Sequence, residues 1–231
     1  MNTNKKVIII TGASKGLGNE LAKLYFQKGS YNLILTARSK EGFNEFKNKE
    51  GVDLIVGDIR EKDTLDSIEK VVEEKYKKVD ILINNAGVIY TQPFEKNTEK
   101  QLDELFDINL KAPILLTQRM YPFMVSQKSG LIININSTAG KEGKANHTLY
   151  AATKFGLRGF TEALRQEAKA HNIRVLSIHP GGMDTHLFDD LEKKPDVSTF
   201  MNAKKVAEII VFLSETEGVS PDEILINRPS S

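Results

Sequence analysis

Short apolar runs alternate with longer helical patterns along this chain, and the alternation constrains the fold more than any other feature. The runs that we predict to be strands lie at residues 7–10, 33–35, 52–56, 81–83, 131–133, 173–178 and 223–226. Helical patterns occupy residues 17–28, 61–77, 100–110, 148–170 and 203–214. Most of the short runs are apolar at nearly every position, which is typical of strands that are covered on both faces.

This order predicts βαβ units with right-handed crossovers, and therefore a parallel sheet. We expect an α/β fold, a doubly wound Rossmann-type parallel sheet of about seven strands with helices on both faces, in a three-layer sandwich. The chain has 231 residues and no internal repeat, so one domain over residues 1–231 is the simplest organisation. Residues 181–199 form the longest stretch without periodicity, and we expect a substrate loop at about 182–200.

Composition excludes several classes of activity. A formal net charge of +1 excludes bulk electrostatic attraction to nucleic acid or to an anionic membrane as the main activity. The chain has no cysteine and only 4 scattered histidines, so we expect no metal site. The first apolar run is shorter than a signal-peptide core, and no run is long enough to span a bilayer. We therefore expect a cytoplasmic protein.

The segment after the first predicted strand has the composition of a phosphate-binding turn. It reads TGASKGLG at residues 11–18 and opens the first predicted helix. Glycines let the backbone approach a pyrophosphate, and the free N–H groups at the helix start face the phosphates. A glycine-rich turn that binds nothing is the alternative, but the strand–turn–helix context favours a dinucleotide. We predict cofactor contacts here by Gly12, Ser14, Lys15, Gly16, Leu17 and Gly18.

The residue that distinguishes NAD from NADP is expected about 20 positions further along the chain. The sequence there is Thr36-Ala37-Arg38-Ser39, with no carboxylate to repel a 2′-phosphate. Arg38 can hold that phosphate in a fork, and Lys15 adds a second positive charge. We therefore predict NADP(H); a merely solvated Arg38 is the alternative interpretation.

A tyrosine and a lysine stand four residues apart in a helical pattern. This spacing puts the phenol of Tyr150 and the ammonium of Lys154 on one helix face. Ser137 follows an apolar run, at the carboxyl end of a predicted strand, where open α/β sheets bind ligands. Two more strands end in turn-forming sequences, Asn84-Asn85-Ala86-Gly87 and Pro180-Gly181. Each alone is most often a simple turn, but together they predict one crevice beside the glycine segment.

In this order the motifs resemble those of the short-chain dehydrogenase/reductase family, in its shorter single-domain type. The matches are T-G-x-x-x-G-x-G at 11–18, N-N-A-G at 84–87, Y-x-x-x-K at 150–154 and P-G-x-x-x-T at 180–185. The resemblance implies a catalytic Asn109 and an adenine-contacting Asp58. It also implies cofactor contacts by Ile59, Asn85, Ala86, Gly87, Tyr150, Lys154, Pro180, Gly181, Met183 and Thr185.

The resemblance and the residues together imply an NADPH-dependent carbonyl reductase, a reversible dehydrogenase in which hydride passes between nicotinamide and a carbonyl or alcohol substrate. Tyr150 would be the general acid and base. Lys154 and an oxidised nicotinamide would lower its pKa from about 10. Ser137 would hydrogen-bond the substrate oxygen. By resemblance only, Lys154 also binds the nicotinamide ribose and Asn109 positions a water.

Two other functions fit parts of the pattern. A catalytically silent, NADP-sensing regulator would have lost the catalytic residues, but Tyr150, Lys154 and Ser137 are all present. An isomerase or dehydratase of the related extended type would need a larger C-terminal region. As a departure from the family's pattern, the common V-D-G-G ending is absent, which weakens any transfer of substrate identity from the family.

We do not predict the substrate beyond a small molecule, because the segment after Thr185 matches no assigned substrate loop. His147 or His186 could line its pocket, although an exposed loop position is the simpler interpretation. By analogy with the family we expect a homodimer or homotetramer, and from the near-neutral net charge we expect no binding to nucleic acid or membrane.

Overall fold

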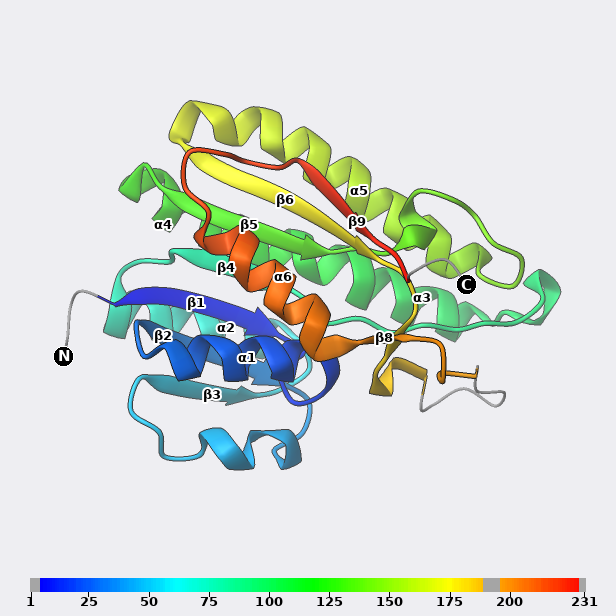
Figure 1. Cartoon of the computed structure of the whole chain (residues 1–231), viewed down its shortest axis with the longest axis horizontal. Coiled ribbons are helices and arrows are strands. Elements are labelled where there is room, and N and C mark those ends of the chain that lie inside the picture. The colour runs from blue at the N-terminus through cyan, green and yellow to red at the C-terminus, as the bar shows by residue number, and fades with distance from the viewer. Residues whose placement is uncertain (1–4, 189–195, 229–231) are drawn as a thin grey trace.

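The computed structural model describes residues 5–188 and 196–228, and it contains a seven-stranded parallel sheet between two layers of helices (Figure 1). The strand order is β3-β2-β1-β4-β5-β6-β9, so the sheet grows in both directions from β1. The strands are β1 (Lys6–Thr11), β2 (Tyr31–Ala37), β3 (Val52–Val56), β4 (Ile81–Asn84), β5 (Gly130–Ile135), β6 (Ile173–Pro180) and β9 (Glu223–Ile226). The predicted Rossmann-type α/β fold is confirmed.

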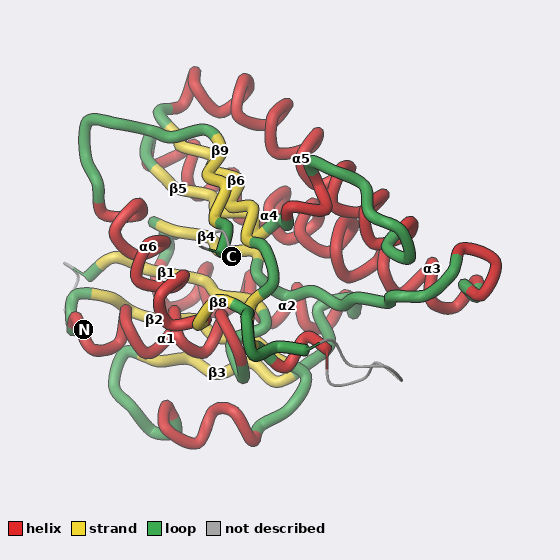
Figure 2. Tube along the Cα trace, turned by 45° about the vertical axis from the view of Figure 1, so that its right-hand side comes forward, coloured by secondary structure: helices red, strands yellow, loops and turns green. Residues whose placement is uncertain are grey.

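Helices cover both faces of the sheet, as the tube in Figure 2 shows. One face packs against α1 (Gly16–Lys28) and α6 (Ala203–Glu215). The other packs against α2 (Lys62–Val71), α4 (Ala112–Gln127) and α5 (Thr148–Ala168), with α3 (Glu99–Phe106) beside α5.

The central strands are apolar at successive positions because both of their faces are covered. On β1, Ile8 and Ile10 contribute to the core under α1 and α6, while Val7 and Ile9 contribute to the core under α2 and α4. All four side chains are fully buried. Two-sided burial removes the polar alternation that a half-exposed strand would show.

The structure contains one long helix that we did not predict, α4. The helix expected at 100–110 is α3 followed by a wide π-helical turn, Asp107–Lys111, which continues directly into α4. Pro122 lies inside α4, and the apolar residues of this helix do not gather on one face. The helix therefore lacks the amphipathic period on which sequence prediction relies, and an internal proline normally argues against a helix.

The predicted substrate loop is only partly described. It begins with β7 (Met183–Asp184), which pairs in parallel with β8 (Met201–Asn202), and a short 3-10 helix, His186–Phe188. Residues 189–195 of the expected loop lie outside the described residues.

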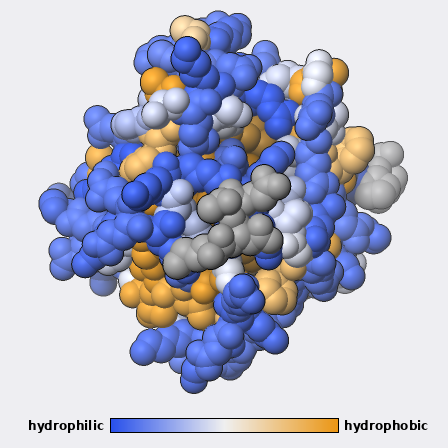
Figure 3. Space-filling view, turned by 90° about the vertical axis from the view of Figure 1, so that its left-hand side faces the viewer, coloured by the Kyte–Doolittle hydropathy of each residue, from blue (hydrophilic) through white to orange (hydrophobic). Residues whose placement is uncertain are grey.

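The surface gives no sign of a bilayer-crossing segment in the part of the chain that the structure describes. No helix there combines the length and the apolar character that a membrane span requires. Seen from the side where β1 begins, the surface is mainly hydrophilic with separate apolar patches (Figure 3).

The two-sided core predicts a large stability cost for truncating β1. Ile9→Ala removes a fully buried side chain and should lower the free energy of unfolding by about 2–5 kcal/mol, through lost burial and an unfilled cavity. Urea denaturation followed by circular dichroism measures this change. The matched control is Ile209→Ala on α6, where the side chain is 41% exposed and the expected loss is below about 1 kcal/mol. Equal losses in the two variants would contradict the two-sided core.

Candidate active site

The carboxyl ends of the central strands become polar in a single row across the sheet. Asn84, Asn134 and Ser177 are register partners on β4, β5 and β6. Asn84 Nδ2 donates to Asn134 Oδ1 at 2.8 Å and to Thr117 Oγ1 of α4 at 3.0 Å. Asn134 Nδ2 donates to Thr161 Oγ1 of α5 at 2.8 Å. This buried row ties both helices to the strand ends and fixes the edge from which the loops of the site emerge.

The glycine segment makes the tight turn that its sequence predicts. Gly12 has φ +65°, a left-handed conformation that favours glycine. A Cβ at Gly18 would lie 2.3 Å from the carbonyl oxygen of Gly12, so only glycine allows this approach of helix to turn. The α1 helix then starts with no side-chain cap and no acidic residue in its first turn. Its first N–H groups are therefore suited to an anion.

The strand end after β4 is bonded directly to the glycine segment. Asn85 Nδ2 donates to the carbonyl oxygens of Thr11 at 2.8 Å and Gly12 at 3.2 Å. In return, Thr11 Oγ1 accepts from the backbone N–H groups of Asn85 at 2.9 Å and Ala86 at 3.0 Å. These four contacts hold two predicted cofactor segments together.

The residues expected near the adenosine end of a dinucleotide also lie at this edge. Arg38 directly follows β2 and is exposed. Asp58 follows β3, and its two oxygens accept from Arg60 Nε at 3.1 Å and Arg60 Nη2 at 2.7 Å. Arg60, and more weakly Arg38, hold the pKa of the Asp58 carboxyl below its ordinary value. Arg60 carries no recognisable signal in the sequence, because no motif marks a carboxylate's partner two residues away.

Some predicted cofactor residues have their side chains in the core. Leu17 and Ile59 are buried and pack in the two opposite core layers. Met183 is partly buried against the α1 and α6 layer. For these three positions any cofactor contact would therefore have to come mainly from the backbone.

Tyr150 and Lys154 lie on the first turns of α5, and Ser137 follows β5. The Ser137 side chain is close enough to the Tyr150 phenol to lower its pKa, and Ser137 Oγ accepts from the Ala139 N–H at 3.1 Å. Lys154 Nζ lies 5.7 Å from the centroid of the Tyr150 ring and donates to the Ile135 carbonyl at 3.0 Å. The structure therefore brings the three predicted catalytic side chains together.

Asn109 stands in the π-helical turn before α4 and is fully buried. Its Oδ1 accepts from the Val88 N–H at 2.9 Å, and its Nδ2 donates to the Val88 carbonyl at 2.9 Å and to Thr153 Oγ1 at 3.3 Å. A Cβ on Gly87 would lie 3.2 Å from Asn109 Oδ1 and 4.0 Å from Lys154 Nζ. The side chain thus fixes the segment after β4 beside Lys154. That Asn109 holds a water stays a prediction. Because the Asn109 side chain is already hydrogen-bonded, such a water would have to bind to the backbone of the π-helical turn.

Burial dominates the protonation of the catalytic pair. It raises the pKa of the Tyr150 phenol to about 12, against a smaller lowering by the hydrogen bond with Ser137. It also lowers the pKa of Lys154 to about 8. We expected Lys154 and an oxidised nicotinamide together to lower the pKa of Tyr150; the protein side chains alone raise it. Removing both groups from water favours their neutral forms more strongly than the ammonium favours a phenolate.

The segment after β6 approaches the glycine segment, as predicted. A Cβ on Gly16 would lie 3.2 Å from Thr185 Cβ, and the Gly181 N–H donates to the Ile226 carbonyl at 2.8 Å, which fixes the turn after Pro180. Leu187 packs against the apolar cluster around Tyr150.

Of the two histidines that we considered for the substrate pocket, His186 is exposed and His147 is partly buried. The ring of His147 lies 6.4 Å from the ring of Tyr150, edge to face. Among the described residues, no group of three or more His, Cys, Asp or Glu is arranged to hold a metal.

Comparison with known proteins agrees with the geometry. A family model described as short chain dehydrogenase matches residues 6–196. The chain belongs to the short-chain dehydrogenase family. Its fold and oxidoreductase class follow from this membership, and the resemblance inferred from the motifs is confirmed.

Individual relatives match over nearly the whole chain. The 3-oxoacyl-(acyl-carrier-protein) reductase of Thermotoga maritima is 32% identical, covering 94% of this chain and 93% of the relative. The closed form of a serine dehydrogenase complexed with NADP+ is 26% identical with a TM-score of 0.88, covering 95% of this chain and 94% of that one. A 3-ketoacyl-(acyl-carrier-protein) reductase of Brucella melitensis complexed with NADH is 26% identical with a TM-score of 0.87, covering 98% of both chains.

The buried ammonium of this dehydrogenase predicts a stability that rises with pH. Lys154 has a pKa of about 8 in the folded state against 10.5 ordinarily, so the unfolded chain binds the proton more tightly. Lys154→Met should raise the free energy of unfolding by up to about 3 kcal/mol below pH 8. The gain should shrink as the pH rises from about 8 to 10.5, where the lysine becomes neutral in both states.

Urea unfolding of both proteins at pH 7 and pH 10 measures this difference. Lys169→Met, at an exposed position beyond α5, is the control and should change little at either pH. A gain of equal size at both pH values would show that the lost charge is not its cause.

Proposed function

We propose that this member of the family is a reversible NADPH-dependent reductase that interconverts a carbonyl and an alcohol in a small molecule. The observation that carries the proposal is the meeting of Tyr150, Lys154 and Ser137 at the carboxyl edge of the sheet, beside the glycine segment. A phenol, an ammonium and a hydroxyl at one point are the groups that proton transfer to a carbonyl oxygen needs.

NADP(H) is the proposed cofactor. The uncapped start of α1 suits a pyrophosphate, and the exposed Lys15 and Arg38 stand where a 2′-phosphate would need positive charge. Of the structures compared above, the serine dehydrogenase was solved with NADP+ and the Brucella melitensis reductase with NADH. The choice of NADP(H) therefore rests on the residues of this chain.

When bound, the nicotinamide supplies or takes the hydride. In the direction of reduction, Tyr150 gives its proton to the oxygen that becomes the alcohol, and its raised pKa keeps it protonated at neutral pH. Lys154, with a pKa of about 8, is mostly charged at pH 7 and stabilises the phenolate that this transfer leaves. Ser137 offers its hydroxyl to the same oxygen. In the direction of oxidation, Tyr150 takes the proton back.

We also propose that the chain assembles as a homodimer or homotetramer. Large apolar side chains are exposed on two helices, Phe155 of α5 at 44% and Phe212 of α6 at 68%. Exposed apolar surface of this kind often marks an interface between proteins.

Tyr150→Phe tests the catalytic assignment. The phenylalanine ring has no hydroxyl and therefore no proton to transfer, so turnover of carbonyl substrates with NADPH should fall at least 100-fold. Stabilisation of the variant by NADP+ in a thermal-shift assay should persist. Tyr121→Phe is the matched control, because the Tyr121 hydroxyl is buried without a hydrogen-bond partner in the described part of the chain. Activity of Tyr150→Phe within about tenfold of wild type, or 1.4 kcal/mol, would defeat the assignment.

Arg38→Asp tests the choice of cofactor. Loss of a charge-assisted contact of about 1.5–3 kcal/mol should lower the ratio of kcat/KM for NADPH over NADH at least tenfold. Lys49→Asp makes the same charge change at an exposed position at the opposite end of the sheet and should leave the ratio unchanged. If both variants keep the wild-type ratio, Arg38 does not recognise the phosphate.

A further inference from the structure

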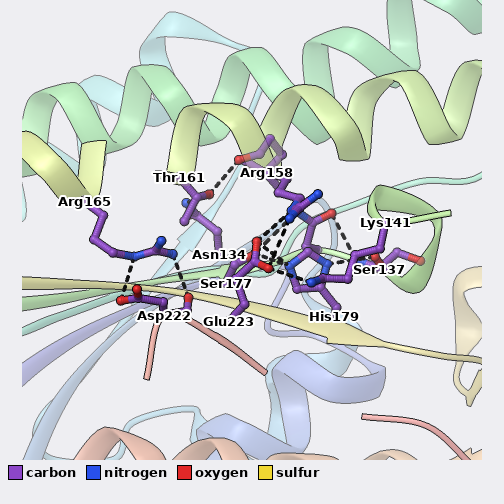
Figure 4. A network of polar contacts seen from close by, with 12 residues as sticks. Asn134, Ser137, Lys141, Arg158, Thr161, Arg165, Ser177, His179, Asp222 and Glu223 are labelled. Atoms are coloured by element: carbon purple, nitrogen blue, oxygen red, sulfur yellow. Dashed lines mark hydrogen bonds and ion pairs between the residues drawn. The ribbon is translucent and has the colours of Figure 1, made fainter. Parts of the chain in front are cut away.

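A buried histidine lies directly behind Ser137 and takes no part in the proposed proton transfer. His179 precedes Pro180 in β6 and is fully buried. Its Nδ1 lies 3.0 Å from the Ser137 carbonyl oxygen, and its Nε2 lies 2.8 Å from Ser177 Oγ (Figure 4).

The partners of His179 determine its tautomer. A carbonyl oxygen can only accept, so Nδ1 must carry the proton that is shared with Ser137. Burial lowers the pKa of His179, which keeps the ring neutral. Its Nε2 is therefore an acceptor, and the hydroxyl of Ser177 donates to it.

The charged groups around His179 are engaged with one another. Glu223 Oε1 lies 3.6 Å from His179 Nε2, beyond hydrogen-bond distance. The Glu223 carboxylate instead accepts from Lys141 Nζ at 2.6 Å and Arg158 Nε at 2.7 Å, and these contacts lower its pKa to about 2. Figure 4 shows this cluster between β6 and α5. The neutral ring thus stands beside a carboxylate that is already neutralised.

Every polar group of Ser137 is hydrogen-bonded, and its carbonyl accepts from two partners, the Gly140 N–H at 2.9 Å and His179 Nδ1 at 3.0 Å. The Ser137 N–H donates to Asn136 Oδ1 at 3.0 Å, and Ser137 Oγ accepts from the Ala139 N–H at 3.1 Å. These contacts hold the turn in place, and the Ser137 hydroxyl is close enough to Tyr150 to lower the pKa of the phenol.

We propose that His179 is a positioning residue for the reduction: by holding the Ser137 carbonyl, it directs the Ser137 hydroxyl toward Tyr150 and the substrate oxygen. This inference rests on the proposed reductase function. His179 bonds to the Ser137 side of the site rather than to the glycine segment. Its loss should therefore affect turnover and leave cofactor binding intact.

Two amide substitutions separate the two ring nitrogens. The Nδ2 of asparagine is as many bonds from Cα as Nδ1 of histidine, so His179→Asn can still donate to the Ser137 carbonyl. The amide of His179→Gln reaches one bond further, toward the position of Nε2. His179→Leu has no donor. His171→Leu is the matched control at a partly exposed histidine next to α5.

We expect His179→Leu and His179→Gln to lower kcat about 10–100-fold, because a small misplacement of a catalytic group is costly. KM for NADPH should change less than about twofold in both. His179→Asn should recover kcat to within about fivefold of wild type, and His171→Leu should match wild type. If His179→Leu does not fold, the comparison of the asparagine and glutamine variants gives the answer.

The inference is overturned if the asparagine variant is no better than the glutamine variant, or if the loss appears in KM alone. A second measurement needs no turnover: 15N NMR of the histidines at pH 7 should show His179 with its proton on Nδ1, and a proton on Nε2 would also overturn it. A wild-type chain that reduces no carbonyl defeats the proposed function. An active wild type with an equally active His179→Leu defeats only the positioning role.

Discussion

The site depends on the parallel pairing of β4, β5 and β6 in one register. Parallel neighbours must be joined by long crossovers, so each strand returns through a helix and all carboxyl ends meet at one edge. At that edge the register row of Asn84, Asn134 and Ser177 replaces apolar side chains by polar ones. Contacts between residues far apart in the chain follow from this, such as the bond from Asn85 to the Thr11 carbonyl. Without the common register, the glycine segment and the start of α5 would not lie at the same edge of the sheet.

The burial that brings Tyr150 and Lys154 together also disfavours the charged forms of both side chains. Tyr150 and Lys154 are 6% and 5% exposed, and burial moves their pKa values to about 12 and about 8. For reduction this is useful, because a protonated phenol is the required acid and the ammonium keeps most of its charge at pH 7. The contact of Lys154 Nζ with the Ile135 carbonyl offsets part of its desolvation. The site therefore holds a destabilised cation inside a fold whose stability comes from the two apolar layers.

The sequence predicted what is encoded locally or at strand ends. The strand at 7–10 is apolar throughout, the turn at 11–18 needs glycine at Gly12, and the spacing of Tyr150 and Lys154 puts them on one helix face. What it missed depends on tertiary approach. α4 carries no amphipathic period, and His179 reaches Ser137 across 42 residues of chain. The raised pKa of Tyr150 in the chain without cofactor was also missed, because the extent of its burial cannot be read from the neighbouring residues.

The C-terminal strand shows how a departure from a family pattern can leave the site intact. The V-D-G-G ending is absent, yet β9 pairs with β6 and sets Glu223 beside Ser177 in the register. From there the carboxylate binds Lys141, which follows the Ser137 turn, and Arg158, which lies one helical turn beyond Lys154. Both cations lie within hydrogen-bond distance, so the three side chains form a network rather than an isolated surface pair. Glu223 of the last strand thereby joins the turn after Ser137 to the catalytic helix α5, without a contribution from the V-D-G-G motif.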